Sequence, residues 1–302
     1  AQPAQPAQPA QPAQPLTNLN HMDRAKLATT IGDLPSLPHV VTRILRLVES
    51  PTASAAQVSQ AISSDQALTS KVLRVANSAY YGFPYQIATV AHATVILGFR
   101  AVKTLVISAF ASAWFDEKGD VIDRQKLWQH SVGCAVAARL LAPRVGWRDA
   151  EEAFTAGLLH DIGRVMLDRY AHRQLRQAVE MARADALSLR EAEQSVFGFT
   201  HSELGQWVME QWKLPLTLCV AIGHHHTPQS APAHGLLVWT VAGADWLCGR
   251  LAIGADDDPM TPEFEQDVLR ALRLSSEDAP ALEEAFWTQW ERATEILGLV
   301  GR

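Results

Sequence analysis

Histidine and aspartate residues lie at several apolar positions in the second half of this 302-residue chain. His130 shares its predicted helix with Leu127 and Leu141, so it projects from the apolar stripe rather than from the solvated face. Asp245 lies inside the apolar run 236–251, where a buried carboxylate requires a partner. These two residues are therefore candidates for chemistry or for a buried ion pair.

Three further positions carry the same residue types at helix ends. His160 and Asp161 end one apolar helix, His201 lies in the first turn of a capped helix, and His225 and His226 end another. A single histidine on an apolar face is more often a hydrogen-bonded core residue than a ligand. Neighbouring residues on a helix point about 100° apart, so several helices must contribute to enclose an ion. Imidazoles with a shared carboxylate suit iron, manganese or zinc, and the whole set indicates a metal site.

The elements that must position these side chains are predicted to be helices throughout. Helical periodicity runs from Asp23 onward, and no alternating strand pattern with hairpin turns occurs. The expected helix starts are Pro38 and the capping residues Ser54, Asp65, Asp123, Asp149 and Thr200, the last with Glu203 at capping-box spacing. The sequence predicts an all-α protein in which an N-terminal helical bundle packs on a second helical bundle.

The predicted organisation has four parts. Residues 1–22 contain five copies of Ala-Gln-Pro and form an extended linker or a cloning-derived leader. The chain starts with Ala, so we expect a piece of a longer protein whose linker tethers an input domain. The N-terminal helical subdomain is expected over 23–118 and the second over 119–255, with the apolar helix 100–114 at their seam. Residues 256–302 are expected to form an acidic loop and a final helix from Pro280 to Leu297.

Composition limits the location and the partners. A formal net charge of −6 argues against binding driven by neutralisation of nucleic-acid phosphates. Three scattered cysteines, Cys134, Cys219 and Cys248, make a poor disulfide framework and favour a reducing cytoplasm. Arg100 and Lys103 interrupt the longest apolar run, so no membrane span is expected.

A known family resembles this sequence at the same histidines and aspartates. The string Gly157-Leu-Leu-His160-Asp161-Ile-Gly-Arg164 resembles the signature of the HD phosphohydrolase superfamily. Its HDOD branch is resembled by His130-Ser131, His201-Ser-Glu-Leu-Gly205, Trp212-Lys-Leu-Pro215 and Ala221-Ile-Gly-His-His225-His226-Thr-Pro228. The first half agrees with that branch at Leu34-Pro-Ser-Leu-Pro38, Ser64-Asp65, Leu73-Arg-Val-Ala-Asn77-Ser78 and Leu97-Gly98. The resemblance covers about residues 30–250 and implies that the second bundle is HD-like.

The resemblance also implies a ligand set. By position, the metal ligands would be His130, His160, Asp161, His201, His225, His226 and Asp245. They would hold one or two divalent ions of iron, manganese or zinc, with Asp161 as the bridging carboxylate. The chemistry allowed would be hydrolysis of a phosphate ester by a water that the metal activates. Asp161 and Arg164 would be the catalytic candidates in an active enzyme.

Two roles are possible for Arg164. It stands where many superfamily members have lysine, and its guanidinium could bind a phosphate bidentately. It could instead form a surface ion pair with Asp168, four residues further along the helix. We favour the surface pair.

Two features favour regulation over catalysis. The stretch after His226 lacks the Gly-Tyr-Pro element of the related cyclic di-GMP phosphodiesterases. HDOD proteins are also regarded as regulatory output modules in bacterial signalling, mostly without demonstrated activity. The ligand residues could then hold a structural metal or form a metal-free His–Asp hydrogen-bond network.

Two hypotheses follow. The favoured one is a bacterial, cytoplasmic signalling module that contacts a protein partner or an attached N-terminal input domain, with a nucleotide or cyclic dinucleotide as a candidate ligand. The alternative is a metal-dependent phosphohydrolase, either a phosphodiesterase or a nucleotide phosphatase. Neither hypothesis requires a membrane or a nucleic-acid partner.

Overall fold

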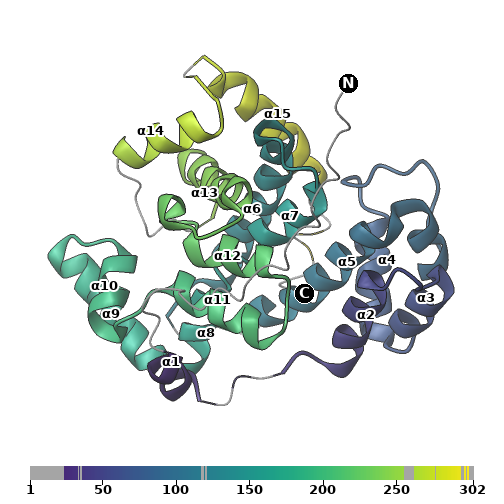
Figure 1. Cartoon of the computed structure of the whole chain (residues 1–302), viewed down its shortest axis with the longest axis horizontal. Helices are drawn as coiled ribbons and strands as arrows, with labels where there is room; N and C mark the ends of the chain where they lie inside the picture. The colour runs from purple at the N-terminus through teal and green to yellow at the C-terminus, as the bar shows by residue number, and fades with distance from the viewer. Residues whose placement is uncertain are drawn as a thin grey trace, which may run out of the picture.

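The computed structural model describes residues 24–32, 34, 36–116, 119, 121–254, 262–275, 277–293, 296 and 298. Every regular element in these ranges is a helix, and the helices form an N-terminal bundle packed on a larger second one (Figure 1). The predicted all-α fold class is therefore confirmed. The Ala-Gln-Pro segment and the predicted acidic loop at 256–258 lie outside the described residues.

The N-terminal bundle is built from short helices packed on one long helix. Its members are α2 (His39–Glu49), α3 (Ala55–Ser63), α4 (Gln66–Ala76) and α5 (Val90–Asp116). The predicted caps are confirmed, since Ser54 accepts the backbone N–H of Gln57 at 3.2 Å and Asp65 accepts that of Leu68 at 2.9 Å. Each cap satisfies a donor that the first turn of a helix leaves free.

The long helix α5 joins the two bundles. It starts ten residues before the predicted Arg100 and is interrupted at Gly98, which has φ 78° and ψ 169°. It contacts α2, α3 and α4 on one side and α6 and α7 on the other, as expected for a helix at the seam. Among the described helices it alone is long and apolar enough to cross a membrane, but 56% of that apolar window is buried inside the protein.

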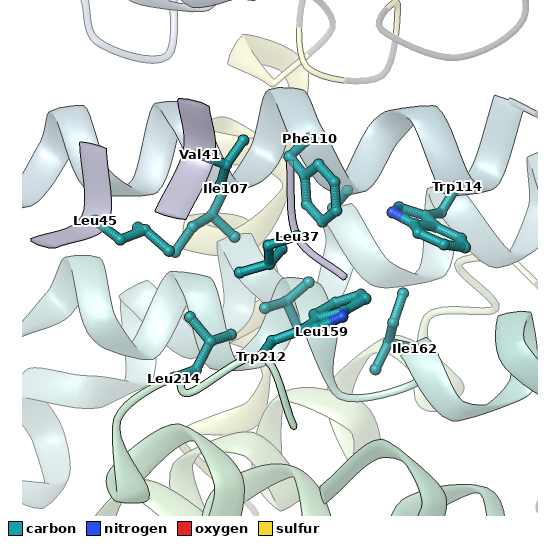
Figure 2. Close-up of a pocket in the computed structure, with 11 residues that line it drawn as sticks. Leu37, Val41, Leu45, Ile107, Phe110, Trp114, Leu159, Ile162, Trp212 and Leu214 are labelled. Carbon is teal, nitrogen blue, oxygen red and sulfur yellow. The ribbon is translucent and has the colours of Figure 1, made fainter. Parts of the chain in front are cut away.

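A small apolar pocket marks this seam (Figure 2). Phe110 and Trp114 of α5 line it together with Trp212 from the second bundle. The Trp212 ring centroid lies 5.6 Å from that of Phe110 and 5.9 Å from that of Trp114. Such aromatic contacts stabilise by more than their buried area alone, and here they connect the two bundles.

The second bundle carries the candidate site. Its helices are α6 (Arg124–Val145), α7 (Ala150–Leu159), α8 (Ile162–Tyr170), α9 (His172–Asp185), α10 (Leu189–Phe197), α11 (His201–Gln211), α12 (Leu216–His224), the 3-10 turn η1 (Pro228–Ser230) and α13 (Gly235–Arg250). The predicted caps Asp123, Asp149 and Thr200 all accept backbone N–H groups of their own first turns. Helix α6 packs on both α7 and α13, and α11 packs on α8 and α12.

Three further helices lie outside this core. The first, α1 (Arg24–Ile31), contacts α8 of the second bundle and lies away from α2 (Figure 1). After α13 come α14 (Pro262–Ala271), which packs on α13, and α15 (Ala279–Arg292), which packs on α6. The last helix begins one residue before the predicted Pro280, and Leu297 lies outside the described residues.

Candidate metal centre

The structure brings all seven predicted ligand residues into one cluster. His130 comes from α6, His160 and Asp161 lie at the junction of α7 and α8, His201 begins α11, His225 and His226 follow α12, and Asp245 comes from α13. Donor atoms from these residues lie close enough together to share metal ions in three overlapping groups. Six helices thus converge on one point inside the second bundle.

Two glycines allow these helices to approach closely. A Cβ at Gly157 would lie 2.4 Å from the carbonyl oxygen of Cys134, which holds α7 directly against α6. A Cβ at Gly163 would lie 1.9 Å from the carbonyl oxygen of His201, where α8 meets the start of α11. Any larger residue at either position would push the ligand-bearing helices apart.

Three of the imidazole rings are anchored by their Nδ1 atoms. His130 faces the carbonyl of Ile253 at 3.1 Å, and His160 faces the carbonyl of Gly157 at 2.8 Å. His225 does the same with its own helix, at 2.6 Å from the carbonyl of Ile222. A carbonyl can only accept, so each Nδ1 carries a proton and each Nε2 points into the cluster. This arrangement is typical of histidines that bind a metal through Nε2.

A fourth ring is anchored by a carboxylate that the sequence interpretation missed. Glu193 on α10 is fully buried, and its Oε2 accepts both the Nδ1–H of His201 at 2.7 Å and the His201 backbone N–H at 2.8 Å. In the sequence, the one indication of this role is that Glu193 shares the apolar face of its helix with Leu189 and Ala192. Such a carboxylate fixes the ring and makes its free nitrogen a stronger ligand.

Asp161 lies between two sets of histidines. Its Oδ2 is 3.5 Å from Nε2 of His160 and 4.0 Å from Nε2 of His130. Its Oδ1 is 3.3 Å from Nε2 of His201 and 4.0 Å from Nε2 of His225. The two oxygens therefore face different groups of nitrogens, which is the geometry that a carboxylate bridging two ions requires.

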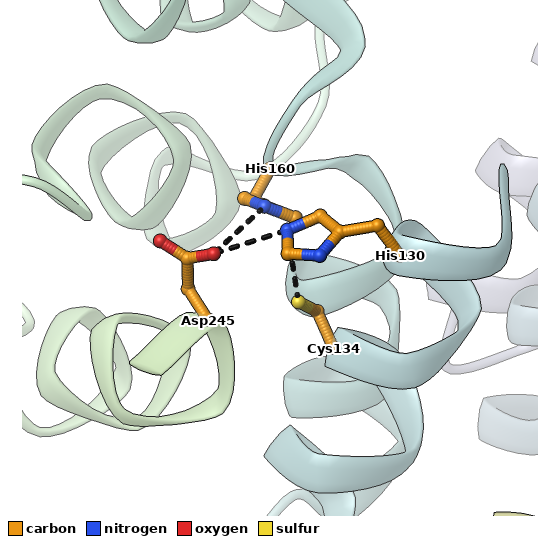
Figure 3. A group of neighbouring side chains, drawn as sticks. All are labelled: His130, Cys134, His160 and Asp245. Atoms are coloured by element: carbon orange, nitrogen blue, oxygen red, sulfur yellow. Dashed lines mark hydrogen bonds and ion pairs between the residues drawn. The ribbon is translucent and has the colours of Figure 1, made fainter. Parts of the chain in front are cut away.

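The cluster has two halves, a first half facing Oδ2 of Asp161 and a second half facing Oδ1, and different residues complete each half. On the Oδ2 side, Asp245 places its Oδ1 3.0 Å from Nε2 of His130 and 3.8 Å from Nε2 of His160 (Figure 3). On the Oδ1 side, Nε2 of His226 lies 3.0 Å from Nε2 of His201. The first half is thus richer in carboxylate oxygens and the second half is richer in imidazoles.

The protonation states follow from burial and neighbouring charge. Burial alone disfavours a charged ring, but the hydrogen bond that His130 donates to Asp245 and the charges of Asp245 and Asp161 raise the pKa of His130 to about 10. Burial would raise the pKa of Asp245, yet its bond to His130 lowers it to about 2. Burial lowers the pKa of His225 to about 3, helped by the nearby His160 and His201 rings. The cluster therefore mixes charged and neutral imidazoles.

Three buried atoms of the candidate ligands have no hydrogen-bond partner. They are Nε2 of His160, Nε2 of His225 and Oδ1 of Asp161. All three side chains are at most 2% exposed, so bulk solvent does not reach these atoms. In the metal-free His–Asp hydrogen-bond network that the sequence left open, these two nitrogens and one oxygen would therefore lie close together without a donor. A divalent cation would satisfy them, and the donor set fits one.

The expectation for Arg164 is wrong. Its side chain is only 4% exposed, and its Nε lies 3.4 Å from Oδ1 of Asp161 rather than beside Asp168. Asp168 is itself buried and pairs with Arg124, whose Nε lies 2.6 Å from its Oδ2. The spacing of four residues along α8 was a misleading guide because α6 supplies a closer cation for Asp168. The Arg164 guanidinium thus belongs to the candidate centre.

Comparisons with known proteins agree with this arrangement. A family model described as HDOD domain matches residues 34–228. A proposed phosphohydrolase from Shewanella amazonensis SB2B superposes with a TM-score of 0.75 at 26% identity, over 93% of this chain and 100% of that one. An HDOD domain protein of unknown function from Geobacter sulfurreducens gives a TM-score of 0.74 at 26% identity, over 91% and 94% of the two chains.

A longer relative is found among curated sequences. An uncharacterized protein of Treponema pallidum (strain Nichols) is 25% identical over 236 residues, which are 78% of this chain and 45% of that protein. The chain therefore spans less than half the length of this relative.

Proposed function

Because this chain belongs to the HDOD domain family and its candidate ligands converge on one centre, we propose that it is a signal-transduction output module built around one or two divalent metal ions. The observation that supports a bound metal is the orientation of the imidazole rings. Nδ1 of His160 and of His225 is anchored on a backbone carbonyl, while Nε2 of each points inward without a partner. A buried lone pair in that state is costly unless a cation binds it.

The accessibility of the centre favours regulation over turnover. The side chains of His226 and Asp245 are 11% and 9% exposed, and those of the other five candidate ligands are 3% or less. Among the candidate ligands, His226 and Asp245 are therefore the most exposed, and the cluster is open to solvent on their side. A substrate phosphate would need to reach the ions through that side, whereas a module that changes partner contacts needs no such access.

The second candidate function is a metal-dependent phosphohydrolase. It is supported by the position of Arg164, which places a cation beside Asp161 where a phosphate would bind, and by the name of the Shewanella relative. A divalent ion in the centre would supply a water of lowered pKa and would neutralise charge on phosphorus. Arg164 would then orient the phosphate through its two parallel N–H groups.

Elemental analysis tests the metal. Tag-free protein, purified without chelators or immobilised metal, is expected to hold about one or two equivalents of iron, manganese or zinc. The double substitution His160→Ala, Asp161→Ala should remove that metal, while His172→Ala, outside the cluster, should retain it. Absence of metal from the wild-type protein after incubation with each ion would refute the centre.

A substrate panel separates the two functions. The metal-loaded protein is incubated with nucleotides, cyclic dinucleotides and a chromogenic phosphodiester. We expect no turnover above that of the double variant, in keeping with a regulatory module in the cytoplasm that acts on a protein partner or an attached input domain. Turnover that the double variant lacks would establish the phosphohydrolase instead.

A further inference from the structure

A cysteine lies inside the candidate centre. Cys134 follows His130 by one helical turn on α6, so the two side chains share a face. Its thiol is fully buried, and its Sγ lies 3.5 Å from Nε2 of His130. The donor atoms of His130, Cys134, His160 and Asp245 all lie within 4.8 Å of one another (Figure 3). The sulfur therefore belongs to the first half of the cluster.

The spacing of the sulfur suits a tetrahedral ion. Zinc binds sulfur at roughly 2.3 Å and imidazole nitrogen at roughly 2.0–2.1 Å, so two such ligands at a tetrahedral angle lie about 3.5 Å apart. The measured distance from Sγ of Cys134 to Nε2 of His130 is 3.5 Å. An independent observation points to the same place, because Nε2 of His160 is buried in this group without a hydrogen-bond partner.

We propose that Cys134 is a thiolate ligand in the first half of the centre, and that this half is therefore selective for zinc. The inference rests on the proposed metal centre and specifies one of its two sites. Thiolate sulfur is a soft ligand that favours zinc over manganese, while the imidazoles and shared carboxylate of the second half suit harder ions as well. The two halves are then chemically distinct sites.

A simpler role for Cys134 would be packing. Its thiol lies near that of Cys248, and both side chains are buried in the core between α6 and α13. Cys248 could serve as the sulfur ligand only by turning toward the cluster, since its sulfur is not among the grouped donor atoms. Cys219, on α12, contacts the carbonyl of Leu214 at 3.6 Å and provides a control thiol outside the centre.

Cobalt substitution tests the ligand directly. Metal-free protein is titrated with Co²⁺ and followed by its absorption spectrum. We expect a near-ultraviolet thiolate-to-cobalt charge-transfer band together with the strong visible bands of tetrahedral cobalt. The Cys134→Ser variant should lose the charge-transfer band, while Cys219→Ser and Cys248→Ser should keep it.

The affinity for zinc gives a second readout. Cys134→Ser should weaken zinc binding at the first half by at least about tenfold and should change manganese binding much less. If Cys134→Ser does not fold, X-ray absorption of the zinc-loaded wild-type protein still decides the question. A sulfur neighbour at about 2.3 Å is expected.

The outcomes separate this inference from the proposed function. Cobalt that binds without a charge-transfer band, or zinc without a sulfur neighbour, would overturn the ligand role of Cys134 and leave the centre in place. A band lost in Cys248→Ser and kept in Cys134→Ser would also overturn the role of Cys134, because the sulfur ligand would then be Cys248 on α13. Failure of the wild-type protein to bind cobalt or zinc at all would overturn the metal centre itself.

Discussion

Glu193 offers a sensitive test of the centre because it contacts His201 at Nδ1 and at the backbone N–H, on the side away from the proposed metal. Its Oε2 accepts two hydrogen bonds from His201, one from Nδ1 at 2.7 Å and one from the backbone N–H at 2.8 Å. In Glu193→Gln the amide oxygen can still accept both bonds, and only the negative charge is lost. In Glu193→Ala the acceptor of both bonds is lost, and two donors of His201 remain buried.

The expected magnitudes differ between the two variants. Removing the outer partner of a ligating histidine typically weakens metal binding by about 10–100-fold. Since Glu193→Gln keeps the ring in place, we expect the lower end, about tenfold, which corresponds to about 1.4 kcal/mol. For Glu193→Ala we expect a loss near 100-fold, together with about 3–5 kcal/mol of lost stability, because a buried ion pair loses one member.

Competition against a chromogenic chelator at neutral pH measures these affinities, and urea unfolding of the metal-free proteins measures the stability. Glu191→Gln is the matched control, since it removes one negative charge from an exposed position on the same helix and keeps its capping box. It should bind manganese and zinc as the wild type does. Glu193→Gln with an affinity within twofold of the wild type for both ions would refute the role of Glu193 in positioning His201.

Three further outcomes are expected. Chelation should lower the melting temperature by roughly 5–10 °C in calorimetry, since a ligand at 100 times its Kd contributes about 2.7 kcal/mol; an unchanged melting temperature would argue against a bound metal. In the metal-free protein, the unfolded state gains a proton on His225 below pH 6.5 that the folded state refuses until about pH 3. As the pH is lowered from about 6.5 to about 3, His225 should therefore reduce the free energy of unfolding in urea by up to about 1.4 kcal/mol per pH unit. The decrease should be less steep in His225→Gln. Gly163→Ala should abolish metal binding in the elemental assay because its Cβ would meet the His201 carbonyl at 1.9 Å, whereas Gly235→Ala, with nothing within 4 Å, should not.

The local features that the sequence predicted correctly are set by short-range hydrogen bonds, whereas the converging set of histidines and aspartates was implied by the resemblance to the HDOD branch. The cap at Asp149 accepts the backbone N–H of Glu152, and the capping box of Thr200 and Glu203 is closed within three residues. Such contacts depend only on local backbone geometry, so their residue types can be read directly. The predicted helix 100–114 corresponds to the part of α5 after the Gly98 interruption, whereas the turns from Val90 to Gly98 were not predicted.

The features that the sequence did not predict depend on chain segments that meet only in the folded protein. Asp168 pairs with Arg124, forty-four residues earlier, rather than with its neighbour on α8. Glu193 reaches His201 across the turn between α10 and α11, and its buried position was visible only as a charged residue on an apolar face. Spacing along one helix gives candidates for such pairs, but the choice among them is made by tertiary packing.

The charge balance of the metal-free centre explains how it can be both buried and stable. Three carboxylates, Asp161, Asp245 and Glu193, lie within it. Burial disfavours a charged His201 ring, but the charge of Glu193 raises its pKa, and Asp245 does the same for His130. The raised pKa of each ring favours its imidazolium form, and the Arg164 guanidinium adds a positive group beside Asp161. These two rings lie in different halves of the cluster, so each half holds one ring whose charged form a carboxylate favours. We therefore expect the folded state to persist without metal, and uptake of an ion would release a proton from a charged ring.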